Sequence, residues 1–184
     1  MGAESASDDP ALGPVLLDAA TIAAGVRRLA ETLERDYAGK APVLLGILSG
    51  AVVFVADLMR NLSLDLQLEW IQMSSYRDAT APGGVSLLNW TARDLQGRDV
   101  ILVDEILDTG ETLRHALQWA RGMNPASLRC CVCFDKPARR RTHLQPDYRA
   151  FVIEDHFVVG YGLDFAGRYR NLPGLVVYRG PARA

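Results

Sequence analysis

The stretch VILVDEILDTGETL, at residues 100–113, decides the fold because a buried strand gives way here to acids and small polar residues. Four consecutive apolar residues, 100–103, follow a turn signal, and such a run is typical of a strand buried on both faces of a parallel sheet. Asp104, Glu105 and Asp108 come next, so we expect these acids at the carboxyl end of the strand. Open α/β sheets bind their ligands at this edge.

A helix is predicted directly after the acids. The apolar residues that recur there with helical spacing are Leu113, Ala116, Leu117 and Ala120. Gly122 then offers a C-cap. The whole stretch therefore reads as a strand, a polar loop and a helix.

Strands and helices alternate on both sides of this unit. Asp18 is a suitable N-cap for a helix that we expect to end at Gly39. A buried strand is predicted at residues 43–48, followed by a tight turn and an apolar helix from about Ala51. Further extended segments are predicted at residues 66–70, 85–90, 127–136, 149–155, 157–160 and 175–178.

This alternation predicts a single α/β domain, with a mostly parallel twisted sheet flanked by helices and a small hood element from the terminal regions. The length of 184 residues fits one domain. We expect residues 1–14 to be a disordered tail and residues 15–184 to be the domain. The start of the chain lacks the basic and apolar regions of a secretory signal. No window has the roughly 18 to 20 apolar residues that a membrane span needs.

The composition is that of an ordinary globular chain, with 49% hydrophobic and 23% charged residues. A net charge of -2 supplies no general attraction to nucleic acid or anionic lipid, so any anion site must be local. Cys130, Cys131 and Cys133 lie in one apolar run, without the spacing of a zinc site or a disulfide framework. We therefore expect buried thiols and a cytoplasmic protein, without membrane or nucleic-acid partners.

The polar loop at residues 108–112 has the composition of a phosphate cradle. A loop of small residues that opens a helix directs several backbone N–H groups one way, and the helix dipole adds to their effect. Gly110 lets the backbone approach an anion, while the hydroxyls of Thr109 and Thr112 can donate to its oxygens. The nearby carboxylates fit a ligand that also carries hydroxyls or a magnesium ion. A phosphorylated sugar meets all of these requirements.

A purely structural interpretation of the same residues also exists. Asp108 or Thr109 could simply cap the helix, with Asp104 and Glu105 as solvated acids at the strand end. Two other phosphate-binding motifs are absent from the sequence, since no strand precedes GxGxxG and no GxxxxGK[ST] occurs.

The stretch at residues 100–113 resembles the phosphoribosyl pyrophosphate (PRPP) motif of the type I phosphoribosyltransferases: an apolar strand, two acids, two apolar residues, then Asp-Thr-Gly-x-Thr. Four other segments resemble, in order, those of the hypoxanthine-guanine phosphoribosyltransferases: LLGILSGAVVFVADL, MSSYRD, DKPARR and FVVGYGLDFAGRYRNLPGL. The likeness runs from about residue 43 to residue 177. It implies the fold of that family and transfer of a 5-phosphoribosyl group from PRPP to a purine, with release of pyrophosphate.

The resemblance also implies roles for the acids and the loop. Asp104 and Glu105 would lie near the ribose hydroxyls and contribute to binding Mg²⁺. Asp108 would be the catalytic residue, accepting a proton from the imidazole ring of the purine. The amides and hydroxyls that would hold the 5-phosphate belong to Asp108, Thr109, Gly110, Glu111 and Thr112.

Further roles concern the base and the leaving group. Lys136 would bind the six-position oxygen of the purine, with Phe157 stacked on the ring and the backbone of Val158 at the base edge. Asp164, next to the base, would hold a second Mg²⁺. The residues assigned to pyrophosphate and the mobile loops are Ser49, Gly50, Ser75, Tyr76 and Arg170. Taken by themselves, Lys136 reads as a surface lysine and Phe157 as a core aromatic.

The chain departs from the family pattern at three positions. Ser49 stands where the family usually has Lys or Arg, and the acid pair Asp104-Glu105 is more often Glu-Asp. His156 replaces the usual Lys before the stacking aromatic. We interpret the arginines at residues 139–141 as a solvated basic run or as contacts in an oligomer.

Two alternatives remain open from the sequence. One is a regulator on the same fold that senses nucleotides or binds RNA, with weak or absent catalysis. The other is an enzyme with a different base, such as xanthine, orotate or uracil. The resemblance also implies a homodimer or homotetramer.

Overall fold

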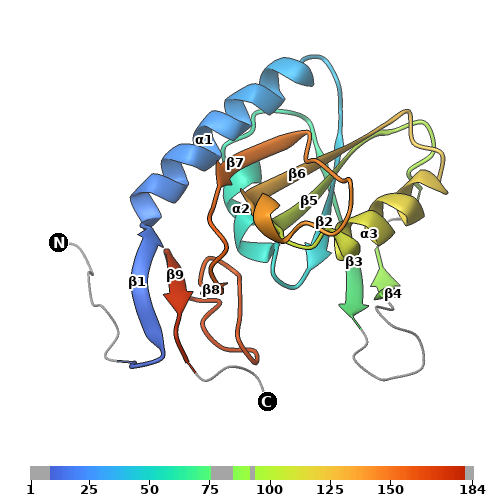
Figure 1. Ribbon diagram of the computed structural model, residues 1–184. Helices are drawn as coiled ribbons and strands as arrows, with labels where there is room; N and C mark the ends of the chain where they lie inside the picture. Colours follow the sequence, from blue (N-terminus) through green and yellow to red (C-terminus); the bar gives the residue numbers. More distant parts are fainter. Residues whose placement is uncertain (1–8, 76–84, 92–93, 181–184) are drawn as a thin grey trace.

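The computed structural model describes residues 9–75, 85–91 and 94–180 of the chain. Within these residues a six-stranded sheet forms the centre and a three-stranded sheet lies beside it (Figure 1). Tyr76, the rest of the polar loop to residue 84, and residues 1–8 of the predicted tail lie outside the described part. The strands are β1 (Leu12–Leu17), β2 (Val43–Leu48), β3 (Gln67–Ser75), β4 (Val85–Trp90), β5 (Asp99–Leu107), β6 (Ser127–Asp135), β7 (Tyr148–Val152), β8 (Val158–Val159) and β9 (Leu175–Tyr178).

The large sheet has the strand order β4-β3-β2-β5-β6-β7, and every neighbouring pair is parallel except β3 and β4. The apolar runs of β2 and β5 place these strands at its centre, where both faces are buried. The predicted mostly parallel α/β sheet is confirmed.

Helices cover both faces of this sheet. Alternate residues of β2 and β5 point to opposite sides, so Leu44 and Ile101 pack with α1 (Ala19–Asp36) and α2 (Val52–Arg60). Leu45 and Leu102 pack instead with α3 (Glu111–Arg121). Among the described residues, none of these helices combines the length and the apolar character that a membrane span requires.

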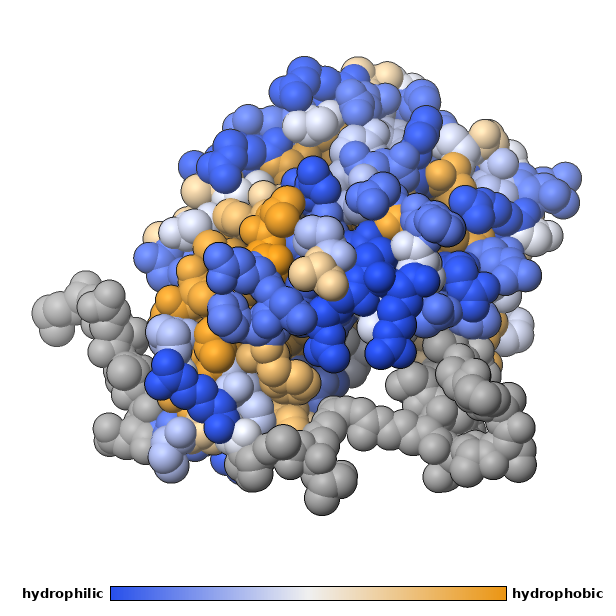
Figure 2. Space-filling view, viewed as in Figure 1, coloured by the Kyte–Doolittle hydropathy of each residue, from blue (hydrophilic) through white to orange (hydrophobic). Residues whose placement is uncertain are grey.

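The small sheet has the order β1-β9-β8 and is antiparallel. It is built from the two ends of the chain, as predicted, and Figure 1 shows it below α1. The viewed face is hydrophobic over β9 and toward the end of β7 (Figure 2).

The predicted boundary of the tail is wrong for residues 9–14. β1 begins at Leu12, and Asp9 accepts a backbone hydrogen bond from the Leu12 N–H. The reason is tertiary, because β1 pairs with β9, more than a hundred residues away along the chain.

The acids of β5 do not follow the strand but belong to it. β5 continues to Leu107 because β6 pairs with it over its full length, with Asp104 opposite Val132 and Leu107 opposite Asp135. Asp104 and Glu105 are therefore held rigidly in the sheet, and Asp108 is the first residue of the loop.

Candidate active site

A cavity of about 400 Å³ lies at the carboxyl ends of β2 and β5. Ligand sites of open α/β sheets occur at this edge because the strand ends and the following loops meet there. The predicted site residues that line the cavity are Ser49, Gly50, Asp104, Glu105, Asp108, Thr109, Gly110, Thr112, Asp164 and Arg170. These residues, from separate segments of the sequence, therefore lie together at one cavity.

The loop between β5 and α3 has free backbone donors. In the part of the chain that the structure describes, the amide N–H groups of Asp108, Thr109 and Gly110 donate to no protein group. All three residues line the cavity, and α3 begins directly after them. Free N–H groups at a helix N-terminus attract anions.

Gly110 is required in this loop for two reasons. Its φ of 88° lies in the left-handed region, which favours glycine. A Cβ atom at this position would also collide with the Oγ1 atom of Thr142. Glu111 turns its side chain away from the cavity, since its carboxylate lies 2.9 Å from Nη2 of Arg114.

Asp104 and Glu105 form a close acid pair. Asp104 is buried, and its Oδ1 atom accepts a hydrogen bond from the Glu105 N–H at 3.1 Å. Burial raises the pKa of the Asp104 carboxyl well above its ordinary value, and the negative charge of Glu105 adds to this effect. A cation that a ligand brings into the cavity would favour the charged form of the pair again, since an opposite charge lowers the pKa of a carboxyl.

The Ser49-Gly50 loop packs tightly against this pair. A Cβ atom at Gly50 would overlap the Glu105 carboxylate, so this acid could not keep its present position beside a larger residue. On the other side, a Cβ atom at Gly162 would collide with the carbonyl oxygen of Gly50. The peptide bond between Leu48 and Ser49 is cis.

Asp108 has an unused acceptor. Its Oδ1 atom is buried and, within the described residues, has no hydrogen-bond partner, although Nε of Arg139 lies 4.0 Å away as an ion-pair partner. Its Oδ2 atom lies 3.5 Å from Nζ of Lys136. The N-cap residue of α3 is Gly110, which has no side chain, and the Thr109 Oγ1 atom accepts from the Glu111 N–H, the first of the helix, at 3.4 Å. The interpretation as a helix cap is therefore wrong for Asp108, whereas Thr109 does bind the helix start. A buried carboxylate oxygen without a donor is rare unless a ligand supplies one.

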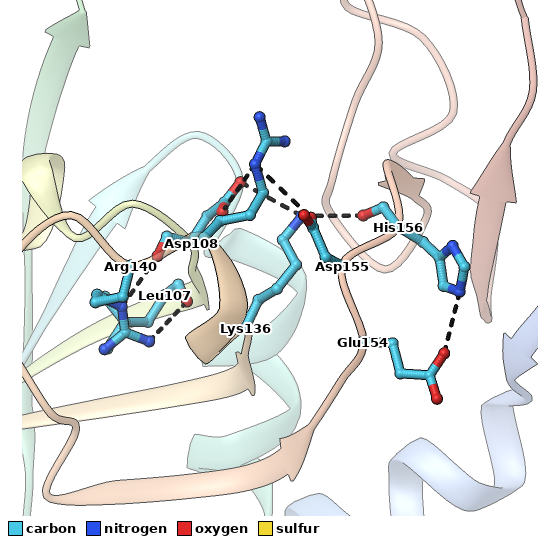
Figure 3. Close-up of polar contacts among 8 residues, drawn as sticks. Leu107, Asp108, Lys136, Arg140, Glu154, Asp155 and His156 are labelled. Atoms are coloured by element: carbon cyan, nitrogen blue, oxygen red, sulfur yellow. Dashed lines mark hydrogen bonds and ion pairs between the residues drawn. The ribbon is translucent and has the colours of Figure 1, made fainter.

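Lys136 is 2% exposed, so its interpretation as a surface lysine is wrong. Its Nζ atom donates to the His156 carbonyl at 2.9 Å and lies 3.6 Å from Oδ1 of Asp155, as Figure 3 shows. The reason for the burial is that Lys136 directly follows β6, a strand in the middle of the sheet. Together with Asp108, it connects the loop after β5 to the segment before β8.

Of the residues predicted to bind the base, Asp164 lines the cavity, whereas Lys136, Phe157 and Val158 do not. Phe157 is 41% exposed and packs against the rings of Phe165 and Tyr178, with centroid distances of 6.0 and 5.6 Å. An exposed aromatic at this place is not the core residue that its local sequence suggests. Val158 is buried in β8.

Asp164 and Arg170 face the cavity as a pair, with 2.8 Å between Oδ1 and Nη2. Asp164 also accepts from the Gly167 N–H, and Arg170 donates to the Gly162 carbonyl at 2.6 Å. Among the described residues, no three acidic, histidine or cysteine side chains gather to hold a metal by themselves. The carboxylates at the cavity suit a cation that shares its coordination with a bound ligand.

Arg140 is a residue that the sequence interpretation missed. Its side chain is only 7% exposed, and it donates to the carbonyls of Leu107 and Asp108 (Figure 3). The expectation of a solvated basic run is therefore wrong for Arg140. Arg139, by contrast, is 44% exposed and lies 3.7 Å from Asp155. A run of three arginines carries no periodicity that could have separated the buried member from the others.

Comparison with known proteins gives a consistent result. Residues 15–166 match the family model described as the phosphoribosyl transferase domain. The hypoxanthine-guanine phosphoribosyltransferase of Streptococcus pneumoniae strain R6 is 37% identical over 166 residues, which cover 90% of this chain and 92% of that protein.

Solved structures agree with the sequence comparison. A hypoxanthine-guanine phosphoribosyltransferase from Bacillus anthracis, with a HEPES molecule in its active site, is 36% identical and superposes with a TM-score of 0.86 over 90% of this chain and 98% of that one. A variant of the hypoxanthine phosphoribosyltransferase from Trypanosoma cruzi, in complex with the product IMP, is 32% identical, with a TM-score of 0.88 and 95% coverage of each chain.

Proposed function

The chain belongs to the phosphoribosyl transferase domain family, and on this premise we propose that it is a purine salvage enzyme. It moves the 5-phosphoribosyl group of PRPP to hypoxanthine or guanine, giving IMP or GMP and pyrophosphate. The relatives that support this assignment carry the name hypoxanthine-guanine phosphoribosyltransferase and match nearly the whole chain.

The observation that carries the proposal is the unused Oδ1 atom of Asp108, which lies buried beside free backbone N–H groups. The N–H groups of Thr109 and Gly110 suit the 5-phosphate, and the carboxylate suits an N–H donor on the next part of the ligand. PRPP brings the 5-phosphate and the free purine brings an imidazole N–H, so the two substrates together supply both groups.

The reaction separates charge, since positive charge grows on the ribose while negative charge grows on the departing pyrophosphate. Asp104 and Glu105 supply negative charge beneath the sugar, held in place by the sheet. Arg170, which lines the same cavity, supplies a cation for the pyrophosphate. Ser49 and Gly50 add backbone N–H groups to this part of the site.

Asp108 acts as the general base in this proposal. Its Oδ1 atom accepts the proton from one imidazole nitrogen of the purine. The lone pair of the other imidazole nitrogen then forms the bond to the ribose as pyrophosphate leaves. Lys136 lies 3.5 Å from the Oδ2 atom of Asp108 and stabilises the charged carboxylate before the proton arrives.

The base is recognised by the segment on the far side of Lys136. The ammonium of Lys136 binds the six-position oxygen, the exposed ring of Phe157 stacks on the purine, and the backbone of Val158 meets its edge. Asp164 lies next to the base.

We propose Mg²⁺ as the cofactor. Asp104, Glu105 and Asp164 provide oxygen ligands at the cavity wall, and Mg²⁺ characteristically combines one or two carboxylates with substrate phosphates. When bound, the ion neutralises the negative charge that develops on the pyrophosphate. PRPP would supply the remaining ligands of the ion.

The wider setting follows from the family. We propose a cytoplasmic homodimer or homotetramer that binds small molecules and neither membrane nor nucleic acid. A regulator that binds RNA is not favoured, because the net charge is -2 and the matching relatives are named as enzymes. Orotate and uracil are disfavoured as bases, because the matching relatives are named for hypoxanthine and guanine.

A base panel tests the proposal. Purified protein is mixed with Mg²⁺, PRPP and, separately, hypoxanthine, guanine, xanthine, adenine, orotate and uracil, and nucleotide formation is followed by absorbance. Turnover of hypoxanthine or guanine that EDTA abolishes is the expected result. Turnover restricted to a pyrimidine, or PRPP binding without turnover of any base, would overturn it.

A further inference from the structure

Arg140 makes more contacts with the cavity loop than any role in an exposed basic run requires. Its Nε atom donates to the Asp108 carbonyl at 3.0 Å, and Nη2 donates to the Leu107 carbonyl at 3.2 Å. The other contacts are a very short bond from Nη2 to Asp135 Oδ1 and one from Nη1 to the Leu144 carbonyl. Figure 3 shows the guanidinium below the Asp108 backbone.

These bonds hold the loop from the side opposite the ligand. The Thr109 carbonyl is bound by the Arg141 N–H at 2.9 Å, and the Gly110 carbonyl accepts from the Arg114 N–H within α3. Consecutive carbonyls of the loop are thus all engaged, while the N–H groups of residues 108–110 remain available at the cavity. Arg140 therefore fixes which side of the first two peptides, those after Leu107 and Asp108, faces the ligand.

Only arginine can make this set of contacts. The planar guanidinium presents donors in a rigid fork, whereas the lysine ammonium carries three donors on a single nitrogen. Asp135, fully buried, pairs with Arg140 and also accepts from Arg149 Nη1 at 2.7 Å. Arg149 is 48% exposed and, in the described structure, does not contact the loop. The two arginines thus share one partner but differ in their relation to the site.

We propose that Arg140 is a positioning residue that holds the loop after β5 for binding of the 5-phosphate and for proton acceptance by Asp108. The inference rests on the proposed function. It assigns to the DKPARR segment a second task besides that of Lys136: the segment connects base recognition to phosphate binding. Because Arg140 lies behind the loop, it does not touch the substrate itself.

The test compares Arg140→Lys with Arg149→Lys. Each variant keeps a positive charge near Asp135. Only Arg140→Lys removes a guanidinium that donates to the backbone carbonyls of the loop. For Arg140→Lys we expect the KM for PRPP and the Kd for IMP to rise by about tenfold or more, since small displacements of positioning groups have effects of this size. For Arg149→Lys both constants stay within about twofold of the wild-type values, as for other exposed positions. Thermal unfolding of both variants is measured alongside.

The outcomes separate the inference from its premise. If Arg140→Lys keeps both constants within about twofold of wild type, or if Arg149→Lys changes them equally, the positioning role is wrong. Should Arg140→Lys not fold, the double variant Arg140→Gln with Asp135→Asn removes the buried charges together and gives the same comparison. If wild type binds IMP but turns over no base, the proposed function fails, and the Kd values still decide the role of Arg140. Absence of IMP binding by wild type overturns both.

Discussion

At the scale of single residues, Asp108 bears most directly on the chemistry. Replacing it by Asn keeps the size of the side chain but removes the negative charge that accepts a proton. We expect kcat to fall by about 10²- to 10⁴-fold, the usual contribution of a general base. Steady-state kinetics with hypoxanthine measure this effect, and calorimetry with IMP measures binding. A variant that retains wild-type kcat would show that Asp108 is not the base.

Gly50 tests the packing of the pyrophosphate loop. In Gly50→Ala the new methyl group meets the Glu105 carboxylate, so the loop or the acid must move. Because the carboxylate ends a flexible side chain and can move aside, we expect a loss of only about 1 kcal/mol in the free energy of unfolding, at the low end of overpacking, together with a higher KM for PRPP.

The matched control for this change is Gly122→Ala. Gly122 has a φ of -62° at the end of α3, and the atom nearest to an added Cβ is the Trp119 carbonyl oxygen at 3.2 Å. Urea denaturation and PRPP kinetics should therefore show a much smaller effect. Equal effects at both positions would argue against a special role for the contact between Gly50 and Glu105.

The places of the site residues were predictable from the sequence where a local motif sets them, and not where long-range packing decides. The cavity-lining set around residues 104–112 was predicted because a strand, acids and small residues follow one another locally. The burial of Arg140 and Lys136 could not be predicted, since both depend on where η1 (Pro137–Arg139) lies relative to β5 and β7. The unpartnered oxygen of Asp108 is likewise a property of three-dimensional neighbours alone.

At the scale of elements, β1 connects the start of the chain to the active site. Leu16 and Leu17 pack on the core that α1 and α2 share, and Asp9 accepts from the Tyr169 hydroxyl at 2.7 Å. Tyr169 neighbours Arg170, which lines the cavity. Removal of residues 1–17 should therefore lower the free energy of unfolding by more than about 2 kcal/mol, because buried leucine contacts are lost.

Kinetics of truncated chains check this connection. Removal of residues 1–8 alone leaves β1 and Asp9 in place and serves as the control. We expect the longer truncation to raise the KM for PRPP and the shorter one to leave it unchanged. If both behave as wild type in urea denaturation, β1 contributes nothing to the fold.

The boundaries of a helix or strand were predictable where the local sequence itself marks the start and the end of the element. β2 has the predicted bounds because its apolar run ends at a polar turn, and α1 begins after Asp18, whose side chain accepts from the Thr21 N–H. β5 is longer than predicted, since pairing with β6 extends it across the acids. β1 was missed because this segment is a strand only through its pairing with β9, which lies far away along the chain.

At the scale of the whole molecule, buried phenols make the fold sensitive to alkali. Burial, followed by the negative charge of Asp99, raises the pKa of Tyr37 to about 12 from 10.0. Burial also raises the pKa of Tyr161, whose hydroxyl donates to Asp57. An unfolded chain releases these protons at lower pH than the folded one, so unfolding is favoured as pH rises.

The direction of the change in stability, and the pH range in which it occurs, follow from the pKa values of Tyr37 in the unfolded and folded chain. The stability that neutral Tyr37 contributes is fully present below the unfolded pKa of 10.0 and is lost as the pH rises toward about 12. Tyr37→Phe should therefore lose less stability than wild type across this window, by on the order of 1 kcal/mol. Urea denaturation on both sides of the window measures the difference. Parallel losses in the two proteins would contradict the assignment.

The central claim is that this chain makes a purine nucleotide by transferring a phosphoribosyl group with Asp108 as base. The most direct measurement follows IMP and pyrophosphate together, by chromatography, after hypoxanthine, PRPP and Mg²⁺ are mixed with wild type and with Asp108→Asn. We predict equal amounts of the two products from wild type and a rate lower by about 10²-fold or more from the variant. Pyrophosphate without IMP, no product at all, or equal rates in the two proteins would contradict the account.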